Sequence, residues 1–223
     1  MAIFYVISTP IGNLEDVTLR AIRVLKEADI VLCEDTRVTK RLFEKHAISS
    51  PMLSYHAHSG ESKVESIFEE IEKGKNIALV TDAGTPGISD PGSLLISHIR
   101  TKYPDLKIEA IPGPSALTAA LSVAGVPTDE FTFLGFLPHK KGRQTLFREI
   151  AESDRTMVFY ESTHRILKTL ESLKGINKKV TIVREITKIY EEVLQGSAED
   201  ILKIMETIPE KQKGEFVVIV SVL

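Results

Sequence analysis

The sequence has 223 residues, of which 43% are hydrophobic and 26% are charged. This composition excludes a chain that is disordered throughout, because enough apolar surface is available to offset the entropy of ordering. The 28 lysines and arginines and the 31 aspartates and glutamates give a net charge of −3. That balance excludes a uniformly basic nucleic-acid coat protein but not a local basic face.

The cysteine content and the N-terminus predict a cytoplasmic protein. Cys33 is the single cysteine, so no disulfide forms within the chain, which fits a reducing compartment. No stretch approaches the roughly 20 apolar residues that span a bilayer, and the apolar segment 1–7 lacks the basic region of a signal peptide. His56 and His58 have no convincing third ligand, so we expect no metal site.

Apolar runs and helical stretches alternate through the first half of the chain. The clearest helix signal is the i, i+3, i+4, i+7 spacing of Val64, Ile67, Phe68 and Ile71, and Gly74 ends that helix. This alternation predicts a mostly parallel sheet with helices on its faces, in which ligands bind in the loops after the strands. We expect strands at 3–8, 30–33, 76–81 and 107–111, helices at 16–28, 64–71 and 92–100, and a basic helix or turn at 36–46.

A Pro-Gly-Pro segment at 112–114 interrupts the pattern. We therefore expect two α/β domains, residues 1–113 and 114–223. Ser197 is expected to cap the last helix of the second domain, with Asp200 as a weak capping-box partner. In that domain we expect strands at 131–136, 156–160, 180–186 and 216–222, and helices at 115–124, 141–152, 164–174 and 198–206.

Three loops that follow predicted strands are rich in glycine, proline and small polar residues. They are 8–14 (STPIGNL), 81–92 (TDAGTPGISDPG) and 111–116 (IPGPSA). Rigid loops with accessible backbone suit an adenine, a ribose or a carboxylate. The first and third could equally be ordinary turns, but the second is too long and too biased for one. No loop has the G-x-G-x-x-G or Walker A spacing, which argues against a dinucleotide oxidoreductase or a P-loop NTPase.

The three loops and four further motifs, in order, resemble the tetrapyrrole methylase superfamily and, within it, the ribosomal RNA small subunit methyltransferase I group. The further motifs are 34–37 (EDTR), 133–138 (FLGFLP), 160–165 (YESTHR) and 184–188 (REITK). The resemblance covers essentially the whole chain. The EDTR motif and the long segment 82–92 are its most specific parts.

The resemblance implies a homodimer of two α/β domains that binds S-adenosylmethionine in the cleft between the domains. It implies methylation of the ribose 2′-hydroxyl of a cytidine in the decoding region of 16S rRNA, with the small ribosomal subunit as substrate, and no membrane partner. By motif position, the cofactor-binding residues would be Pro10, Ile11, Ala83, Gly84, Thr85, Ile88, Ser89, Ser115 and Ala116.

The sequence departs from the resemblance at two points. Thr85 stands where many superfamily members carry the aspartate of a Gly-Asp-Pro motif, so no charged side chain is expected toward the cofactor there. Many members also continue beyond the strand that corresponds to 214–218 with a small C-terminal segment, whereas this sequence stops at Leu223. If that segment grips rRNA, the resemblance implies that this chain does without it or uses its dimer partner.

A general base is useful because a ribose hydroxyl is a weak nucleophile. The candidates are Glu34, Asp35, Glu161 and His164, which lie in matched motifs at strand ends. Helix capping with a local salt bridge explains the EDTR motif equally well, and pairing with Arg165 at i, i+4 is the alternative for Glu161. The sequence does not select among the four.

Two basic clusters favour an RNA partner. One would form a stripe on the helix at 36–46, and the other is the segment 139–148, which contains no acidic residue. Either cluster alone would fit a solvated helix face, but two clusters beside ligand-type loops favour nucleic acid. The candidate RNA-binding residues are Arg37, Lys40, Arg41, Lys140, Lys141 and Arg143.

Two other functions share parts of this pattern. A methyltransferase acting on a tetrapyrrole or another small molecule would use the same cofactor loops but would not need the basic clusters. A cofactor-binding module without catalysis would not need the polar residues at the strand ends.

Overall fold

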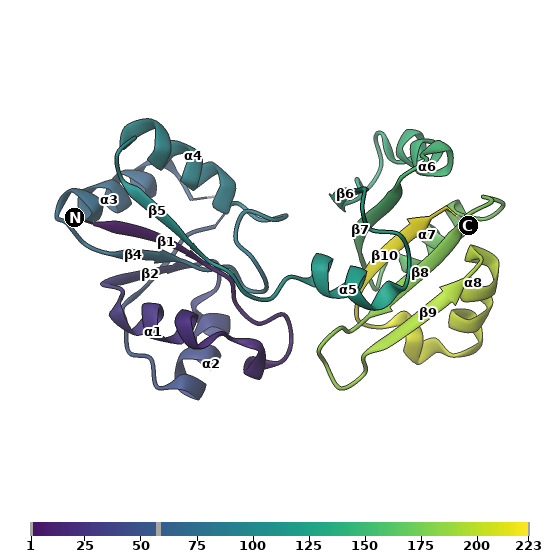
Figure 1. Cartoon of the computed structure of the whole chain (residues 1–223), viewed down its shortest axis with the longest axis horizontal. Helices are drawn as coiled ribbons and strands as arrows, with labels where there is room; N and C mark the ends of the chain where they lie inside the picture. The colour runs from purple at the N-terminus through teal and green to yellow at the C-terminus, as the bar shows by residue number, and fades with distance from the viewer. Residues whose placement is uncertain (1, 57–58, 223) are drawn as a thin grey trace. The chain divides into compact units, whose positions relative to one another are not determined.

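A computed structural model of the protein describes residues 2–56 and 59–222. The chain divides into two compact units, Met1–Ser115 and Ala116–Leu223 (Figure 1). In the described ranges, no helix is both long enough and apolar enough to cross a membrane.

The first unit contains a five-stranded parallel sheet in the order β3-β2-β4-β1-β5. This confirms the mostly parallel sheet that the sequence predicts. The three-residue strand β3 was not predicted, because so short a run gives no periodic signal. The strands are β1 (Ile3–Ile7), β2 (Ile30–Cys33), β3 (Met52–Ser54), β4 (Ile77–Leu79) and β5 (Lys107–Ile111).

Helices cover both faces of this sheet. Figure 1 shows α1 and α2 on one face and α3 and α4 on the other. The side chains of β1 alternate between two cores, with Phe4 in the α3–α4 core and Ile7 in the α1–α2 core. The elements are the 3₁₀ helix η1 (Leu14–Asp16), α1 (Leu19–Glu27), α2 (Thr36–His46), α3 (Glu61–Glu72) and α4 (Gly92–Lys102).

The first of these helices begins later than the prediction of 16–28. The Thr18 side chain accepts a hydrogen bond from the Ala21 N–H (3.1 Å) and caps α1, so the chain before it forms η1 instead. The predicted helix at 64–71 is confirmed inside α3, where Ile67, Phe68 and Ile71 are buried.

The second unit contains a mixed sheet in the order β6-β7-β10-β8-β9. Strands β6 and β7 are parallel, whereas β10 runs antiparallel to both β7 and β8. The loops after β6, β7 and β8 therefore lie at one edge, together with the start of β10, and we call this the carboxyl edge of the second sheet. The strands are β6 (Phe131–Phe136), β7 (Thr156–Ser162), β8 (Lys179–Arg184), β9 (Glu192–Gly196) and β10 (Glu215–Ser221).

Strand β9 pairs antiparallel with β8 and was not predicted. It is an edge strand whose residues are only partly buried or exposed, so it lacks the continuous apolar run that identifies a central strand. Strand β8 ends at Arg184 instead of the predicted residue 186, because Glu185 has a left-handed backbone conformation with φ of +51°.

One core of the second unit lies between its sheet and the helices α6 (Arg143–Glu152), α7 (Ile166–Ser172) and α8 (Ala198–Thr207). Leu137, Phe159, Ile166 and Val218 belong to it, and α5 contacts β8 and β10. The Ser197 hydroxyl accepts a hydrogen bond from the Asp200 N–H (3.1 Å), which confirms the predicted cap of the last helix. The helices are α5 (Ala116–Ala124), α6 (Arg143–Glu152), α7 (Ile166–Ser172), α8 (Ala198–Thr207) and the 3₁₀ helix η2 (Pro209–Gln212).

Candidate functional site

The three ligand-type loops meet at the carboxyl ends of the neighbouring strands β4, β1 and β5. Thr9 and Gly84 form an isolated antiparallel bridge, in which the Thr9 N–H donates to the Gly84 carbonyl (2.9 Å) and the Gly84 N–H donates back (3.1 Å). The Ser8 N–H donates to the Ile111 carbonyl (3.1 Å). Backbone hydrogen bonds therefore fix the first loop to the other two.

Side chains add further connections between the loops. The Thr85 hydroxyl donates to the Pro114 carbonyl (3.1 Å) and lies 2.9 Å from the Ser8 hydroxyl. The Thr9 hydroxyl donates to the Thr81 carbonyl (2.9 Å). Thr85, where many superfamily members carry an aspartate, thus connects all three loops.

The packing of these loops leaves little room for a side chain at Gly113, and the backbone conformation disfavours one at Gly84. A Cβ at Gly113 would lie 3.0 Å from the Ser8 Cβ, and a Cβ at Gly84 would lie 3.4 Å from Ile11 Cγ2. Gly84 also has φ of +89°, which a side chain would strain. The glycines are therefore needed for the close approach of the loops.

Asp90 gives the loop 81–92 its shape. Its carboxylate accepts hydrogen bonds from the Gly87 N–H (2.8 Å to each oxygen) and the Gly92 N–H (2.7 Å). Between them, Ser89 has φ of +66°, an uncommon conformation for a residue other than glycine. Sequence reasoning named Asp90 only as part of a motif, although an aspartate two residues before a helix-starting glycine signals such a turn.

The accessible residues of the three loops fit a nucleoside-type cofactor. Ala83, Ile88 and Ser89 are exposed, and the Ile88 side chain offers an apolar surface with 43% of the residue accessible. Pro10 and Ile11 are buried. None of the nine predicted cofactor residues carries charge, so recognition there would use backbone groups and apolar contact. Gly84 is also buried, whereas Thr85, Ser115 and Ala116 are partly exposed.

Glu34 lies at the end of β2, beside the start of the second loop. Its Oε1 accepts a hydrogen bond from the Thr81 hydroxyl and another from the Asp82 N–H (3.4 Å). The Asp82 carboxylate in turn accepts from the Asp35 N–H (3.0 Å). The structure thus brings Glu34 and Asp35 together with the cofactor-type loop, which the sequence alone did not show.

Asp35 caps α2, as the alternative interpretation of its motif predicts. It accepts a hydrogen bond from the Arg37 N–H (2.8 Å) and pairs with the Arg37 guanidinium (2.6 Å). The hydrogen bond from the Arg37 side chain is the main cause that lowers the pKa of Asp35 to about 2. A carboxylate with so low a pKa is a weak proton acceptor.

Glu161 is fully buried between two arginines. Its carboxylate lies 2.7 Å from Arg165 Nε and 3.4 Å from Arg143 Nη2, and it accepts a hydrogen bond from the Thr169 hydroxyl (2.6 Å). The i, i+4 pairing with Arg165 was the predicted alternative and is confirmed. The pairing with Arg143 was not predicted, because the two residues are 18 positions apart.

The basic residues differ in their surroundings. Arg143 was predicted for an RNA-binding face, yet its side chain is only 14% exposed and points to Glu161. Lys140 and Lys141 are exposed in the loop before α6. On α2, Arg37, Lys40 and Arg41 are exposed, and Lys40 pairs with Glu44 at 3.7 Å.

The remaining predicted site residues are the histidines. His164 is exposed in the turn after β7, at the carboxyl edge of the second sheet. Of the pair His56 and His58, the second lies outside the described residues. Within 2–56 and 59–222, no group of three or more histidines, cysteines or acidic residues could hold a metal ion.

Comparison with known proteins identifies the class of protein to which this fold and these loops belong. The model of the tetrapyrrole (corrin/porphyrin) methylases matches residues 4–202, so the chain belongs to the tetrapyrrole methylase family. It is 45% identical to the ribosomal RNA small subunit methyltransferase I of Halalkalibacterium halodurans over 97% of this chain and 75% of that protein. It is 39% identical to that of Thermotoga maritima over 97% of this chain and 96% of that protein. Within the family, the chain therefore belongs to the ribosomal RNA small subunit methyltransferase I group.

Solved structures agree with the fold. The crystal structure of the methyltransferase CobJ matches with a TM-score of 0.70 and 20% identity, over 100% of this chain and 95% of that one. A crystal structure of diphthine synthase matches with a TM-score of 0.69 and 17% identity, over 100% and 90%. The predicted fold class is thereby confirmed. Family membership makes the protein a methyltransferase and implies S-adenosylmethionine as its methyl donor.

Proposed function

We propose that the protein transfers a methyl group from S-adenosylmethionine to the ribose 2′-hydroxyl of a cytidine in the decoding region of 16S rRNA. The substrate would be the small ribosomal subunit, and the enzyme a homodimer. The names of the relatives and the motifs along the whole chain support the RNA substrate. The observation that carries the proposal is the joining of three backbone-rich loops beside the Glu34 carboxylate.

When bound, S-adenosylmethionine supplies a methyl group on a positively charged sulfur. The protein has to bind and align the two reactants, exclude water and provide an acceptor for the proton of the hydroxyl group. We propose that the three loops hold the cofactor. Pro10, Ile11, Gly84 and Thr85 would fix the loop geometry, while Ala83, Ile88, Ser89, Ser115 and Ala116 would contact the cofactor.

We assign Glu34 as the residue that accepts the proton of the ribose hydroxyl. Both hydrogen bonds to its carboxylate come from uncharged groups and reach the same oxygen, Oε1. Among the described residues, Oε2 has no donor and Glu34 has no ion-pair partner. Asp35 and Glu161 are each held by arginine, so they suit positioning more than proton transfer. His164 is the alternative base, since it too is without an ion pair in the described chain.

The proposed RNA contacts are Arg37, Lys40, Arg41, Lys140 and Lys141, all of which are exposed. Positive side chains bind the phosphate backbone and make the affinity dependent on salt. Arg143, whose side chain donates to Glu161 and to the Pro138 carbonyl, would hold the loop that carries Lys140 and Lys141 instead of contacting RNA.

The experiment that tests the proposal is methyl transfer to small ribosomal subunits that lack the modification. Labelled S-adenosylmethionine is supplied, the rRNA is digested, and the labelled nucleoside is identified by mass spectrometry. Label in 2′-O-methylcytidine from the decoding region supports the proposal. Label in a small molecule of a cell extract, or bound cofactor without any transfer, would support one of the two competing functions instead.

Variants at Glu34 test the assignment of the base. Glu34→Gln keeps the hydrogen bonds to Oε1 but cannot accept a proton, so turnover should fall about 100-fold or more while cofactor affinity is retained. Glu27→Gln serves as the matched control, because it makes the same exchange at an exposed carboxylate on α1, outside the candidate site. Full activity of Glu34→Gln would shift the assignment to His164.

A further inference from the structure

The loop 185–191 joins β8 to β9 at the carboxyl edge of the second sheet, and its backbone is strained. Glu185 and Thr187 have φ of +51° and +67°, which residues other than glycine rarely adopt. The Thr187 hydroxyl oxygen is buried and has no hydrogen-bond partner among the residues that the structure describes. Such strain persists only where the surroundings over-determine the conformation, and it concentrates at functional sites.

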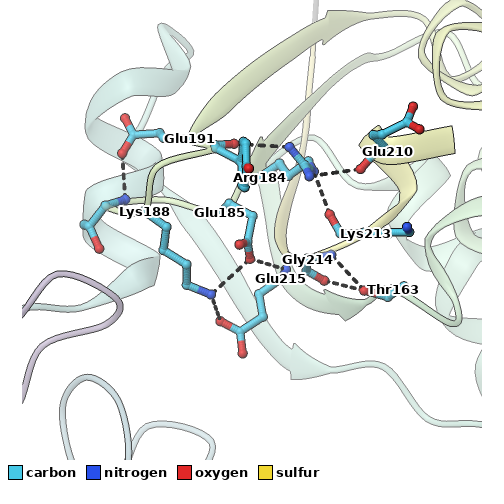
Figure 2. Close-up of polar contacts among 11 residues, drawn as sticks. Thr163, Arg184, Glu185, Lys188, Glu191, Glu210, Lys213, Gly214 and Glu215 are labelled. Atoms are coloured by element: carbon cyan, nitrogen blue, oxygen red, sulfur yellow. Dashed lines mark hydrogen bonds and ion pairs between the residues drawn. The ribbon is translucent and has the colours of Figure 1, made fainter. Parts of the chain in front are cut away.

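A network of polar contacts holds this loop in place, as Figure 2 shows. The buried Arg184 side chain donates to the carbonyls of Lys213 (2.6 Å), Tyr190 (3.1 Å) and Glu210 (3.0 Å). Lys188 Nζ pairs with Glu185 (3.0 Å) at one end of the loop. The loop is thereby tied to the segment that precedes β10.

Gly214 completes the network. Its carbonyl accepts a hydrogen bond from the Thr163 hydroxyl (2.7 Å), which connects the loop after β7. The Glu185 carboxylate accepts from the Glu215 N–H (2.9 Å), and Lys188 reaches the Glu215 carboxylate (2.8 Å). The segment 210–215 therefore holds the loop 185–191, and the loop after β7 is bonded to that segment.

The rigid loop holds two large side chains in solvent. Ile189 is 94% exposed and Tyr190 is 70% exposed. Single exposed apolar residues are common. Here, however, a strained loop that is held by hydrogen bonds and ion pairs fixes the position of Ile189 and Tyr190. The preorganisation of an exposed aromatic ring lowers the entropic cost of binding to it.

Other exposed residues of the same edge indicate what binds there. Phe136 at the end of β6 is 57% exposed, Lys140 and Lys141 are exposed in the loop after β6, and Lys213 is exposed before β10. Aromatic rings interspersed with lysines are typical of surfaces for unpaired RNA, where rings stack on bases and lysines contact phosphates. A face for a second copy of the chain would need about 800 Å² of complementary surface, far more than two side chains provide.

The charges next to the loop favour contact with a base instead of a phosphate. Lys188 is neutralised by Glu185 and Glu215, and Glu192 pairs with Lys211. Glu191 is exposed and accepts a hydrogen bond from the Thr187 N–H (2.6 Å). A phosphate would be repelled by this carboxylate, whereas the uncharged face of a nucleobase would not.

We propose that Tyr190 stacks on an unpaired nucleotide of the RNA substrate, while Lys140 and Lys141 hold phosphates elsewhere along the RNA at the same edge of the second sheet. The proposal rests on the proposed function, because it assumes an RNA substrate. It adds a specific contact to single-stranded RNA that uses residues other than those of the cofactor loops.

Binding of unmodified small ribosomal subunits to the full chain tests the proposal. Tyr190→Ala should weaken binding about 5- to 100-fold, which is the range for loss of one base–aromatic stack. Tyr190→Phe is the matched control and should bind as the wild type does, because the ring is kept. The affinity for S-adenosylmethionine, measured by calorimetry, should be the same in all three proteins.

Salt dependence separates the two kinds of contact. Lys140→Ala/Lys141→Ala should reduce the slope of log affinity against log salt by about 0.7 to 0.9 per lysine, whereas Tyr190→Ala should leave that slope unchanged. Sedimentation of each variant reports whether its oligomeric state is that of the wild type. The side chain of Tyr190 is largely exposed, so the alanine variant should fold, and its thermal midpoint checks this.

The outcomes are distinguishable. If the wild-type protein itself fails to bind and methylate the subunits, the proposed function fails. If the wild type binds and Tyr190→Ala binds equally well, the stacking contact is refuted while the proposed function stands. If Tyr190→Ala instead dissociates a dimer, the loop is a contact between copies of the chain and the inference is overturned.

Discussion

Removal of the Glu161 carboxylate should destabilise the second unit severely. The side chain is 0% exposed and lies between two arginines whose side chains are each 14% exposed. Glu161→Ala would leave both guanidinium groups buried without their counter-charge. Breaking a buried ion pair in this way costs about 3–5 kcal/mol, a large share of the roughly 5–15 kcal/mol that stabilises a typical domain.

Glu161→Ala should also change the conformation of the loop that carries Lys140 and Lys141. Arg165 donates to the Leu137 carbonyl (2.7 Å), and Arg143 donates to the Pro138 carbonyl (3.3 Å). Both arginines are oriented by Glu161, so the carboxylate determines the path of the chain before α6. Weaker RNA binding should therefore accompany the lower stability.

Urea unfolding followed by circular dichroism measures the effect. The matched control is Glu27→Gln, which removes the partner of Arg23 from an ion pair of 2.9 Å that is more than half exposed. Solvent screens such a pair, so the control should change the free energy of unfolding very little. A loss below about 1 kcal/mol for Glu161→Ala would refute the reasoning, since it would mean that the arginines find other partners or water.

Three further predictions concern the loops and the EDTR motif. Asp90→Ala should weaken S-adenosylmethionine binding about tenfold or more in calorimetry, and Asp90→Asn less, because the asparagine still accepts a hydrogen bond; unchanged affinity would contradict a shaping role. Asp35 should titrate near pH 2 by NMR, and Arg37→Ala should raise its pKa toward 3.8. Because the pKa of Asp35 is lower in the folded than in the unfolded chain, its interaction with Arg37 stabilises the fold above about pH 4. That stabilisation is lost as the pH falls toward 2. Gly214→Ala should cost about 1–3 kcal/mol in thermal unfolding. The reason is that Gly214 has φ of +117° and that a Cβ there would lie 2.6 Å from Glu185 Cγ. Gly60→Ala is the control and should be tolerated, because a Cβ at Gly60 would have no atom within 4 Å.

Local signals in the sequence predicted most of the first unit. The four predicted strands and the helix at 36–46 follow from apolar runs and periodicity, and the loop positions follow from glycine and proline. Strands β3 and β9 gave no such signal, since one has three residues and the other lies at an edge. The antiparallel course of β10 was also beyond local reasoning, because strand direction depends on which distant segments pair.

The sequence predicted which residues belong to the candidate site, but it did not predict the contacts between them. The sequence placed Thr85 in a cofactor loop, but its contacts to Ser8 and Pro114 link residues that are 77 and 29 positions away. The same limit applied to Arg143, which appeared to belong to a basic surface. Its guanidinium instead donates a hydrogen bond to the carboxylate of Glu161, 18 residues further along the chain.

The four predicted acid–base residues show why the type of residue and its position at a strand end do not define a role. Asp35 and Glu161 are both paired with arginine, yet one pair is largely solvent-exposed and the other is buried. Glu34 has only uncharged donors on one oxygen, so its other oxygen can face a reacting hydroxyl. Environment therefore separates a helix cap, a buried structural anchor and a candidate base that are indistinguishable in the sequence, because each role is set by partners that folding brings from elsewhere in the chain.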